Sequence, residues 1–312
     1  MEKFKELPLI KQIRQSVGLQ RFMLLAGLVI IVLFVLTAIF APLLAPFGFA
    51  QTKDHGVSFV PQSAPSRAHL LGTTVGGLDV LSRVIWGSQT ALFAIIVSVL
   101  ASLFLGVLLG LLAGYFGGWL DKILVAIADA IYSFPSLLLA IVMAIVLNSN
   151  GGSVLSGILS AGISITVVFV PQYLRVVRSE VLKVKTEAYI DSAKAVGAST
   201  GRIIFKHVLK NATRTLPVII TMNAAEAILT LAGLGFLGLG IEPSSASEWG
   251  YDLNRAISDV TAGIWWTAVF PGIAIVTVVT GITLLGEGLN DLSDPRLRIR
   301  RKPTPFEEVT HD

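Results

Sequence analysis

Six long apolar stretches dominate this sequence of 312 residues and constrain its fold more than any other feature. The hydrocarbon core of a bilayer is about 30 Å thick, and a helix needs about 20 mostly apolar residues to cross it. Lipid offers no hydrogen bonds to the backbone, so each crossing segment must be helical or part of a closed barrel. We therefore predict an all-α membrane protein with six transmembrane helices. The predicted spans are 22–47, 90–115, 123–147, 153–174, 216–239 and 264–285.

Prolines lie inside several of these stretches, for example at positions 135, 171 and 271. Membrane helices tolerate proline where neighbouring groups satisfy the freed carbonyls, so we expect the spans to continue through all three. The first stretch is too long, and begins too far from the N-terminus, to be a cleaved signal sequence.

The composition excludes several classes of protein. Only 14% of the residues are charged, whereas soluble domains carry about 25%. This argues against a soluble enzyme, a disordered chain or a nucleic-acid-binding module, although the net charge is +4. The chain has no cysteine, which removes disulfides and cysteine-based metal sites, and we expect no metal site of another kind.

The positions of Lys and Arg predict the orientation, because cytoplasmic segments are enriched in these residues. With the N-terminus inside, 20 of the 24 fall in cytoplasmic segments, and both termini are cytoplasmic. The predicted organisation is then a cytoplasmic segment (1–21), a first transmembrane helix (22–47), an outer loop (48–89), a five-helix core (90–289) and a cytoplasmic tail (290–312). A second outer loop covers 241–262, and a basic inner loop begins at residue 175.

The inner loop contains a pattern typical of two short helices joined by a turn. In the first helix, one face carries apolar or small residues, and the other carries Glu187, Asp191 and Lys194. The residues of the apolar face are Tyr189, Ile190, Ala193, Val196 and Gly197. Gly197 permits a helix-ending turn, and Ser199 can cap a second helix over 202–210. Such a helix either lies on the lipid surface or docks into a partner, and its small apolar face favours docking.

The segment YIDSAKAVGASTGRIIFKHVLKN (189–211) resembles the coupling loop of ABC importer permeases, whose Glu-Ala-Ala-x-x-x-Gly motif marks the helix that docks into the ATPase. Four further segments resemble hallmarks of the C-type, second permease of the dipeptide, oligopeptide and nickel importers. They are HLLGTTVGGLDVLSRVIWG (69–87), SFPSLLLAI (133–141), FLGLGIEPSSASEWG (236–250) and GEGLNDLSDPRLR (286–298). Asp191 stands where the family usually has Glu, and Lys210 where it usually has Pro.

This resemblance implies a type I ABC importer permease fold with short cytoplasmic coupling helices near 187–210, in the cytoplasmic membrane of a bacterium or archaeon. It implies a second permease subunit as heterodimer partner, two ATP-binding subunits and an extracytoplasmic solute-binding protein. The residues implied in ATPase coupling are Glu187, Asp191, Ser192, Ala193, Gly197 and Ala198. No glycine is followed by lysine, so the chain lacks an ordinary phosphate-binding loop, and ATP and Mg²⁺ belong to partner subunits. We expect no cofactor in this chain and peptides as the solute, with nickel or oligosaccharides as alternatives.

Two further sites are candidates. Glu226 lies midway along the fifth span, where an ionisable residue indicates function by default. It either lines the translocation path or is a buried structural group. In the acidic second outer loop, Glu242, Glu248 and Trp249 are candidates for contact with the binding protein, and the alternative is a plain solvated loop.

Gly106, Gly110 and Gly114 form consecutive GxxxG spacings that predict close helix packing. A rival interpretation is a secondary transporter that uses Glu226 as an ion site. An intramembrane enzyme is disfavoured, because the spans lack a Ser/His pair, a paired-Asp arrangement or a metal-binding cluster.

Overall fold

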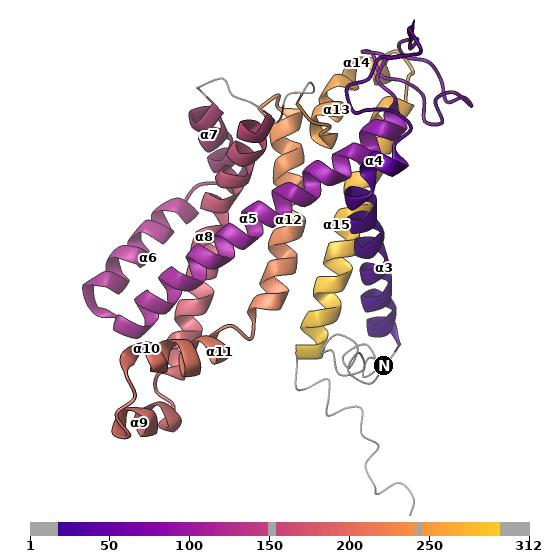
Figure 1. Ribbon diagram of the computed structural model, residues 1–312. Helices are drawn as coiled ribbons and strands as arrows, with labels where there is room; N and C mark the ends of the chain where they lie inside the picture. The colour runs from indigo at the N-terminus through magenta and orange to yellow at the C-terminus, as the bar shows by residue number, and fades with distance from the viewer. Residues whose placement is uncertain (1–17, 149–153, 240, 242–244, 294–312) are drawn as a thin grey trace, which may run out of the picture.

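The computed structural model describes residues 18–148, 154–239, 241 and 245–293, and it is mostly helical (Figure 1). In this part of the chain, five helices are long and apolar enough to cross a membrane, and a bent pair supplies a sixth crossing if it is counted as one. The five are α3 (Leu19–Ile39), α5 (Val80–Phe116), α8 (Val154–Val184), α12 (Leu216–Phe236) and α15 (Trp266–Ser293). The bent pair is α6 (Gly118–Tyr132) and α7 (Ser136–Asn148).

The third predicted span is therefore not a continuous helix, and the expectation that it runs through Pro135 is wrong. The chain bends by 95° between α6 and α7. Proline has no N–H to donate, and its ring disfavours helical geometry in the preceding residue, here Phe134. By contrast, α8 and α15 do continue through Pro171 and Pro271.

Several helices extend beyond the predicted apolar stretches. α5 begins at Val80, so the last ten residues of the predicted outer loop 48–89 are helical. α8 continues to Val184, ten residues into the predicted basic loop. Arg83 and Arg175 consequently lie within long membrane helices, and each forms an ion pair with an aspartate.

The remaining elements are short. They are α4 (Ala41–Leu44), β1 (Lys53–Asp54), β2 (Val57–Ser58), α9 (Ala188–Ala195), α10 (Thr200–Arg202), the π-helix η1 (Ile203–Val208), α11 (Leu209–Ala212), α13 (Trp249–Arg255) and α14 (Ile257–Thr261). β1 and β2 form an antiparallel hairpin. α13 and α14 lie within the predicted second outer loop (241–262), where the sequence predicted no helices.

α8 is the most buried of the five long helices, and its close contact with α5 depends on glycine. In its most apolar stretch 67% of the residues are buried, against 22% in α3. A Cβ atom on Gly106 would lie 2.3 Å from Cβ of Tyr173, and one on Gly114 would lie 2.7 Å from Cβ of Val181. The predicted packing role of the GxxxG spacings is confirmed, because only glycine allows the two backbones to approach so closely.

α3 packs along α15, at the side of the bundle away from α6 and α7 (Figure 1). A Cβ atom on Gly27 would lie 2.6 Å from the backbone nitrogen of Leu285. The first and last long helices are thus in backbone contact.

The two ends of the bundle differ. At one end, α9, α10 and α11 lie beneath α8 and α12, on the same side as the start of α3 and the end of α15 (Figure 1). At the other end, residues 45–79 pack against α13 and α14, and we call this assembly the outer cap. Gln62 Nε2 donates to Asp259 Oδ1 at 2.6 Å, and Trp266 Nε1 donates to the Thr73 carbonyl at 3.2 Å. The first outer loop is therefore fixed to the segments around α14 and α15.

Candidate functional site

At the end of the bundle opposite the outer cap, α9 and the turn that follows it form a compact knob, and we call residues 187–198 the knob. α9 begins after Glu187 and ends at Ala195. The Gly197 N–H donates to the Lys194 carbonyl at 2.9 Å, and the Ala198 N–H donates to the Ala193 carbonyl at 3.0 Å. With Gly197 at φ +83°, this is a Schellman motif, in which glycine adopts the left-handed conformation at little cost. The predicted turn at Gly197 is confirmed.

The predicted apolar face of α9 is only partly correct. Ile190 is fully buried, whereas Val196 is 88% exposed and Tyr189 is 42% exposed. Val196 caps the helix at φ −80°, ψ 1°, so it no longer follows the helical repeat. Ile190 attaches the knob to the bundle, and Val196 projects from its surface.

The six predicted coupling residues fall into two groups. Glu187, Asp191, Ser192 and Gly197 are exposed, and Asp191 accepts a hydrogen bond from Lys194 Nζ at 2.9 Å. Ala193 and Ala198 are half-buried against the core. The knob thus presents a small, mixed polar and apolar surface on a well-packed base.

The second helical segment, from α10 to α11, connects the knob to the bundle. Ile203, Ile204 and Val208 are buried in the same core cluster as Ile190 and as residues of α8. Asn211 Nδ2 donates to the Tyr189 hydroxyl at 2.9 Å. Ser199 occupies the predicted N-cap position, but its side chain makes no capping hydrogen bond. The knob is therefore connected to α8 through packed side chains.

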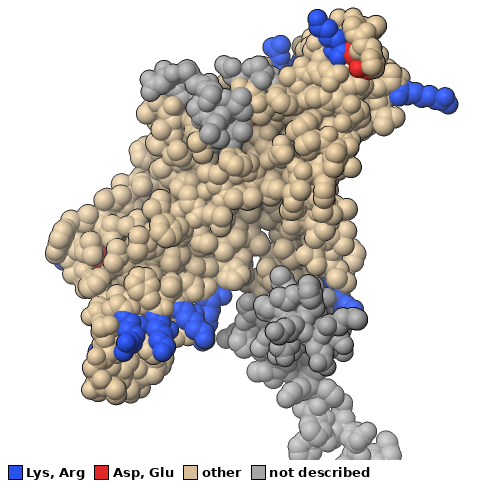
Figure 2. All heavy atoms as spheres, viewed as in Figure 1, with Lys and Arg blue, Asp and Glu red and all other residues tan. Residues whose placement is uncertain are grey.

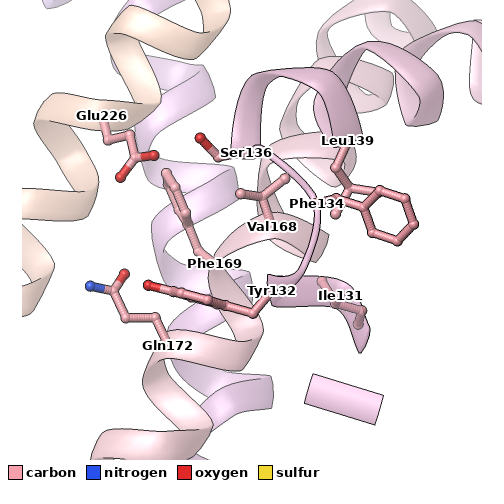
Figure 3. A pocket seen from close by; sticks show the side chains of 9 residues that line it. All are labelled: Ile131, Tyr132, Phe134, Ser136, Leu139, Val168, Phe169, Gln172 and Glu226. Atoms are coloured by element: carbon pink, nitrogen blue, oxygen red, sulfur yellow. The ribbon is translucent and has the colours of Figure 1, made fainter. Parts of the chain in front are cut away.

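A cavity of about 210 Å³ opens beside the break between α6 and α7 (Figure 3). Glu226 of α12 and Ser136 of α7 point toward each other in its upper part, while Gln172 of α8 and Tyr132 of α6 lie below them. The other lining residues are Ile131, Phe134, Leu139, Val168 and Phe169. Glu226 is partly exposed, so the structure places it on a cavity wall rather than in the protein core.

A second ionic group lies next to this cavity. Arg175 of α8 pairs with Asp129 of α6 at 2.6 Å and stands over the ring of Tyr132, with 4.4 Å from its Cζ to the ring centroid. Both charged side chains are about half exposed. Among the residues that line the described cavity, Glu226 is the only acidic or basic side chain.

Two buried polar side chains near the cavity were not identified from the sequence. Asn223 lies one turn before Glu226 on α12, and Tyr173 follows Gln172 on α8. Asn223 and Tyr173 are 1% and 0% exposed, and their side chains interact with each other in the interior. No local pattern marks these residues, since each resembles an ordinary position in an apolar helix.

The structure corrects the prediction that Glu248 and Trp249 contact an external protein. They are only 3% and 4% exposed. The Glu248 carboxylate caps α13 by accepting the N–H groups of Gly250 at 2.8 Å and Tyr251 at 2.7 Å. Trp249 Nε1 donates to the Val84 carbonyl at 3.0 Å. Both side chains hold the outer cap against the bundle, and Glu242 lies outside the described residues.

Burial also changes the acidity of this region. Desolvation raises the pKa of Glu248 to about 8, since it outweighs the two backbone N–H groups that favour the carboxylate. Space for the carboxyl group comes from Gly235 of α12, where a Cβ atom would lie 1.7 Å from Oε2 of Glu248.

A multi-pass helical bundle with a protruding knob and a polar cavity is typical of a membrane transport subunit. Sequence comparison identifies the family: the chain belongs to the binding-protein-dependent transport system inner membrane components, whose profile matches residues 106–299. Residues 21–61 match the N-terminal transmembrane domain of oligopeptide transport permease C. The chain is thus an ABC importer permease with the type I fold, as the resemblance predicted.

Two relatives illustrate the similarity. The dipeptide transport system permease protein DppC of Alkalihalophilus pseudofirmus is 38% identical over 274 residues, which cover 88% of this chain and 86% of the relative. The glutathione transport system permease protein GsiD of Shigella flexneri is 36% identical over 279 residues, which cover 89% of this chain and 88% of the relative.

Proposed function

We propose that this chain is one of two different permease subunits of an ATP-driven importer for di- or oligopeptides. The names of its relatives support peptides as the solute, because dipeptides and glutathione are both short peptides. An extracytoplasmic binding protein delivers the solute, and two ATPase subunits supply the energy and hold the ATP and Mg²⁺. The end that carries the knob faces the cytoplasm, and both termini lie on that side.

The main structural support for this proposal is the knob. Its exposed residues, Val196 above all, dock into a cleft of an ATPase subunit. Closure of the ATPase pair then pushes the knob, and the packed core around Ile190 passes the movement to α8. Asp191 is a charge at the rim of the contact, and Ala193 and Ala198 permit close packing at its base.

Glu226 lies on the translocation path. The cavity that it lines opens where α6 bends into α7, and a change in this bend alters access to the cavity. In the outer cap, the exposed side chains of Arg255, Ile257 and Val260 are better placed than Glu248 and Trp249 to meet the binding protein.

The experiment measures ATP-driven peptide uptake by the complete importer in proteoliposomes. Val196→Asp and Gly197→Leu alter the knob tip and its turn. Val57→Asp is the matched control for the first, because Val57 is 72% exposed at the opposite end. Gly56→Leu matches the second, since Gly56 and Gly197 share φ +83° and neither has an atom within 4 Å of an added Cβ.

We expect both knob variants to insert and assemble with the second permease but to lose most ATP-driven uptake, while both controls keep it. Normal uptake by the knob variants would overturn the coupling role. Gradient-driven uptake by the permeases without ATPase subunits would instead establish a secondary transporter. Identification of the ligand bound to the partner binding protein would separate peptides from nickel or oligosaccharides.

A further inference from the structure

Four basic side chains line the segment that joins the knob to the bundle. Arg202, Lys206, Lys210 and Arg214 occur at every fourth position and are all exposed. We call these four residues the basic stripe. Residues 199–215 contain no Asp or Glu, and no member of the stripe forms an ion pair with a described residue.

The helical geometry keeps the stripe on one side. In an α-helix of 3.6 residues per turn, a four-residue step overshoots a full turn, whereas in the wider π-helix it falls short. The stripe begins at α10, passes through η1 and ends just beyond α11. The excess rotation of the α-helical steps and the deficit of the π-helical steps therefore offset each other. The opposite side is anchored, because Ile203, Ile204 and Val208 are buried in the core.

The segment lies across the ends of α8 and α12, between the bundle and the knob (Figure 1). Figure 2 shows Lys and Arg side chains in a row at this level of the molecule. Phe205, 64% exposed, lies within the same segment. An exposed aromatic ring among cations, at the ends of membrane helices, matches the boundary between acyl chains and headgroups.

We propose that the basic stripe binds the phosphate groups of anionic phospholipids at the inner surface of the membrane. Clusters of basic residues beside transmembrane helices are attracted to anionic leaflets. The ATPase is the less suitable partner, because α9 extends beyond the stripe and offers its own exposed surface for docking. Asp191 of the knob pairs with Lys194 and Glu180 of α8 pairs with Lys183, and Glu187, the other acid of the knob, is exposed and forms no ion pair with the stripe.

The test uses the complete importer, purified in detergent and mixed with equal amounts of phosphatidylglycerol and phosphatidylcholine. Lipids retained after affinity capture are quantified by mass spectrometry. We expect the wild-type importer to retain phosphatidylglycerol in preference, and Lys206→Gln with Lys210→Gln to weaken this binding by about thirty-fold at low salt. Raising the salt concentration should also weaken the binding of phosphatidylglycerol by the wild-type importer, because salt screens the charges.

Two controls define the outcome. Lys206→Arg with Lys210→Arg keeps the charge and should keep the preference. Lys53→Gln with Arg67→Gln removes two exposed charges from the opposite end and should also keep it. The proposal is overturned if the wild type shows no preference, if the double Gln variant of the stripe retains it, or if that variant sheds its ATPase subunits while lipid retention is unchanged.

This inference rests on the proposed function only for the identity of the inner side. Because it needs neither ATP nor substrate, its failure would leave the coupling role untouched.

Discussion

Arg83 and Asp252, 169 residues apart in the chain, form a buried two-point ion pair that joins α5 to the outer cap. Arg83 Nη2 lies 2.6 Å from Oδ1 and Nε lies 3.0 Å from Oδ2, and the side chains are 1% and 8% exposed. Arg83 Nη1 also donates to the Phe49 carbonyl. One guanidinium thus connects a membrane helix, the first outer loop and α13.

Asp252→Asn should therefore destabilise the protein strongly, because it leaves the Arg83 charge buried without a partner. Loss of one member of a buried pair costs about 3–5 kcal/mol. The measurement is thermal unfolding of the purified protein in detergent. The double variant Arg83→Met with Asp252→Leu should be less destabilised than the sum of its single changes. Additive effects would show that the two side chains do not act as a pair.

Stability of the outer cap should fall as the pH rises through the raised pKa of Glu248. Folding favours the protonated carboxyl group, so the stabilisation is complete below pH 4.5, the ordinary pKa, and is lost as pH approaches and passes about 8. The slope is about 1.4 kcal/mol per pH unit where the group is ionised only in the unfolded chain. The measurement is the unfolding temperature between pH 5 and 9.

Glu248→Gln is the control, because it cannot ionise and should flatten this slope. Burial also raises the pKa of Asp252, so a dependence of the same sign should persist in the variant. An identical pH profile for wild type and Glu248→Gln would show that Glu248 does not titrate in this range.

Gly106→Ala should loosen the contact between α5 and α8. The added methyl group would lie 2.3 Å from Cβ of Tyr173, and overpacking of this kind costs about 1–3 kcal/mol. Gly272→Ala in α15 is the matched control, since no atom lies within 4 Å of its added Cβ. Thermal unfolding should separate the two variants, and equal unfolding temperatures would contradict the close packing.

The sequence sufficed for features that depend on local pattern. Long apolar runs predict spans because lipid demands helices of fixed length. The turn at Gly197 was predictable since the left-handed conformation favours glycine over residues with a Cβ atom. The close packing of α5 on α8 was readable from the GxxxG spacings for a similar steric reason.

Features that depend on distant partners were not predictable. Arg83 lies in the predicted outer loop 48–89. In the structure it is buried in a helix, because Asp252, 169 residues away, neutralises its charge. Glu248 and Trp249 lie in an acidic segment that indicated exposure, yet Gly235 and Gly87 on other helices make room for their side chains. Pro135 interrupts its span, whereas α8 continues through Pro171.

Glu226→Gln should reduce peptide uptake while leaving assembly and ATP hydrolysis intact. Within the cavity of Figure 3, Glu226 is the group able to form a charge-assisted hydrogen bond with the ammonium of a free peptide N-terminus. Loss of that charge should raise the KM for peptides about tenfold. Peptides with an acetylated N-terminus should be much less affected, because they carry no terminal ammonium.

The matched control is Glu287→Gln, which removes an exposed carboxylate from α15 and should leave transport of both peptides unchanged. If Glu226→Gln slows free and acetylated peptides equally, the carboxylate shapes the cavity without recognising charge. If it abolishes uptake and makes ATP hydrolysis independent of the binding protein, Glu226 belongs to the coupling machinery, because a path-lining group would alter solute affinity before it altered ATP turnover.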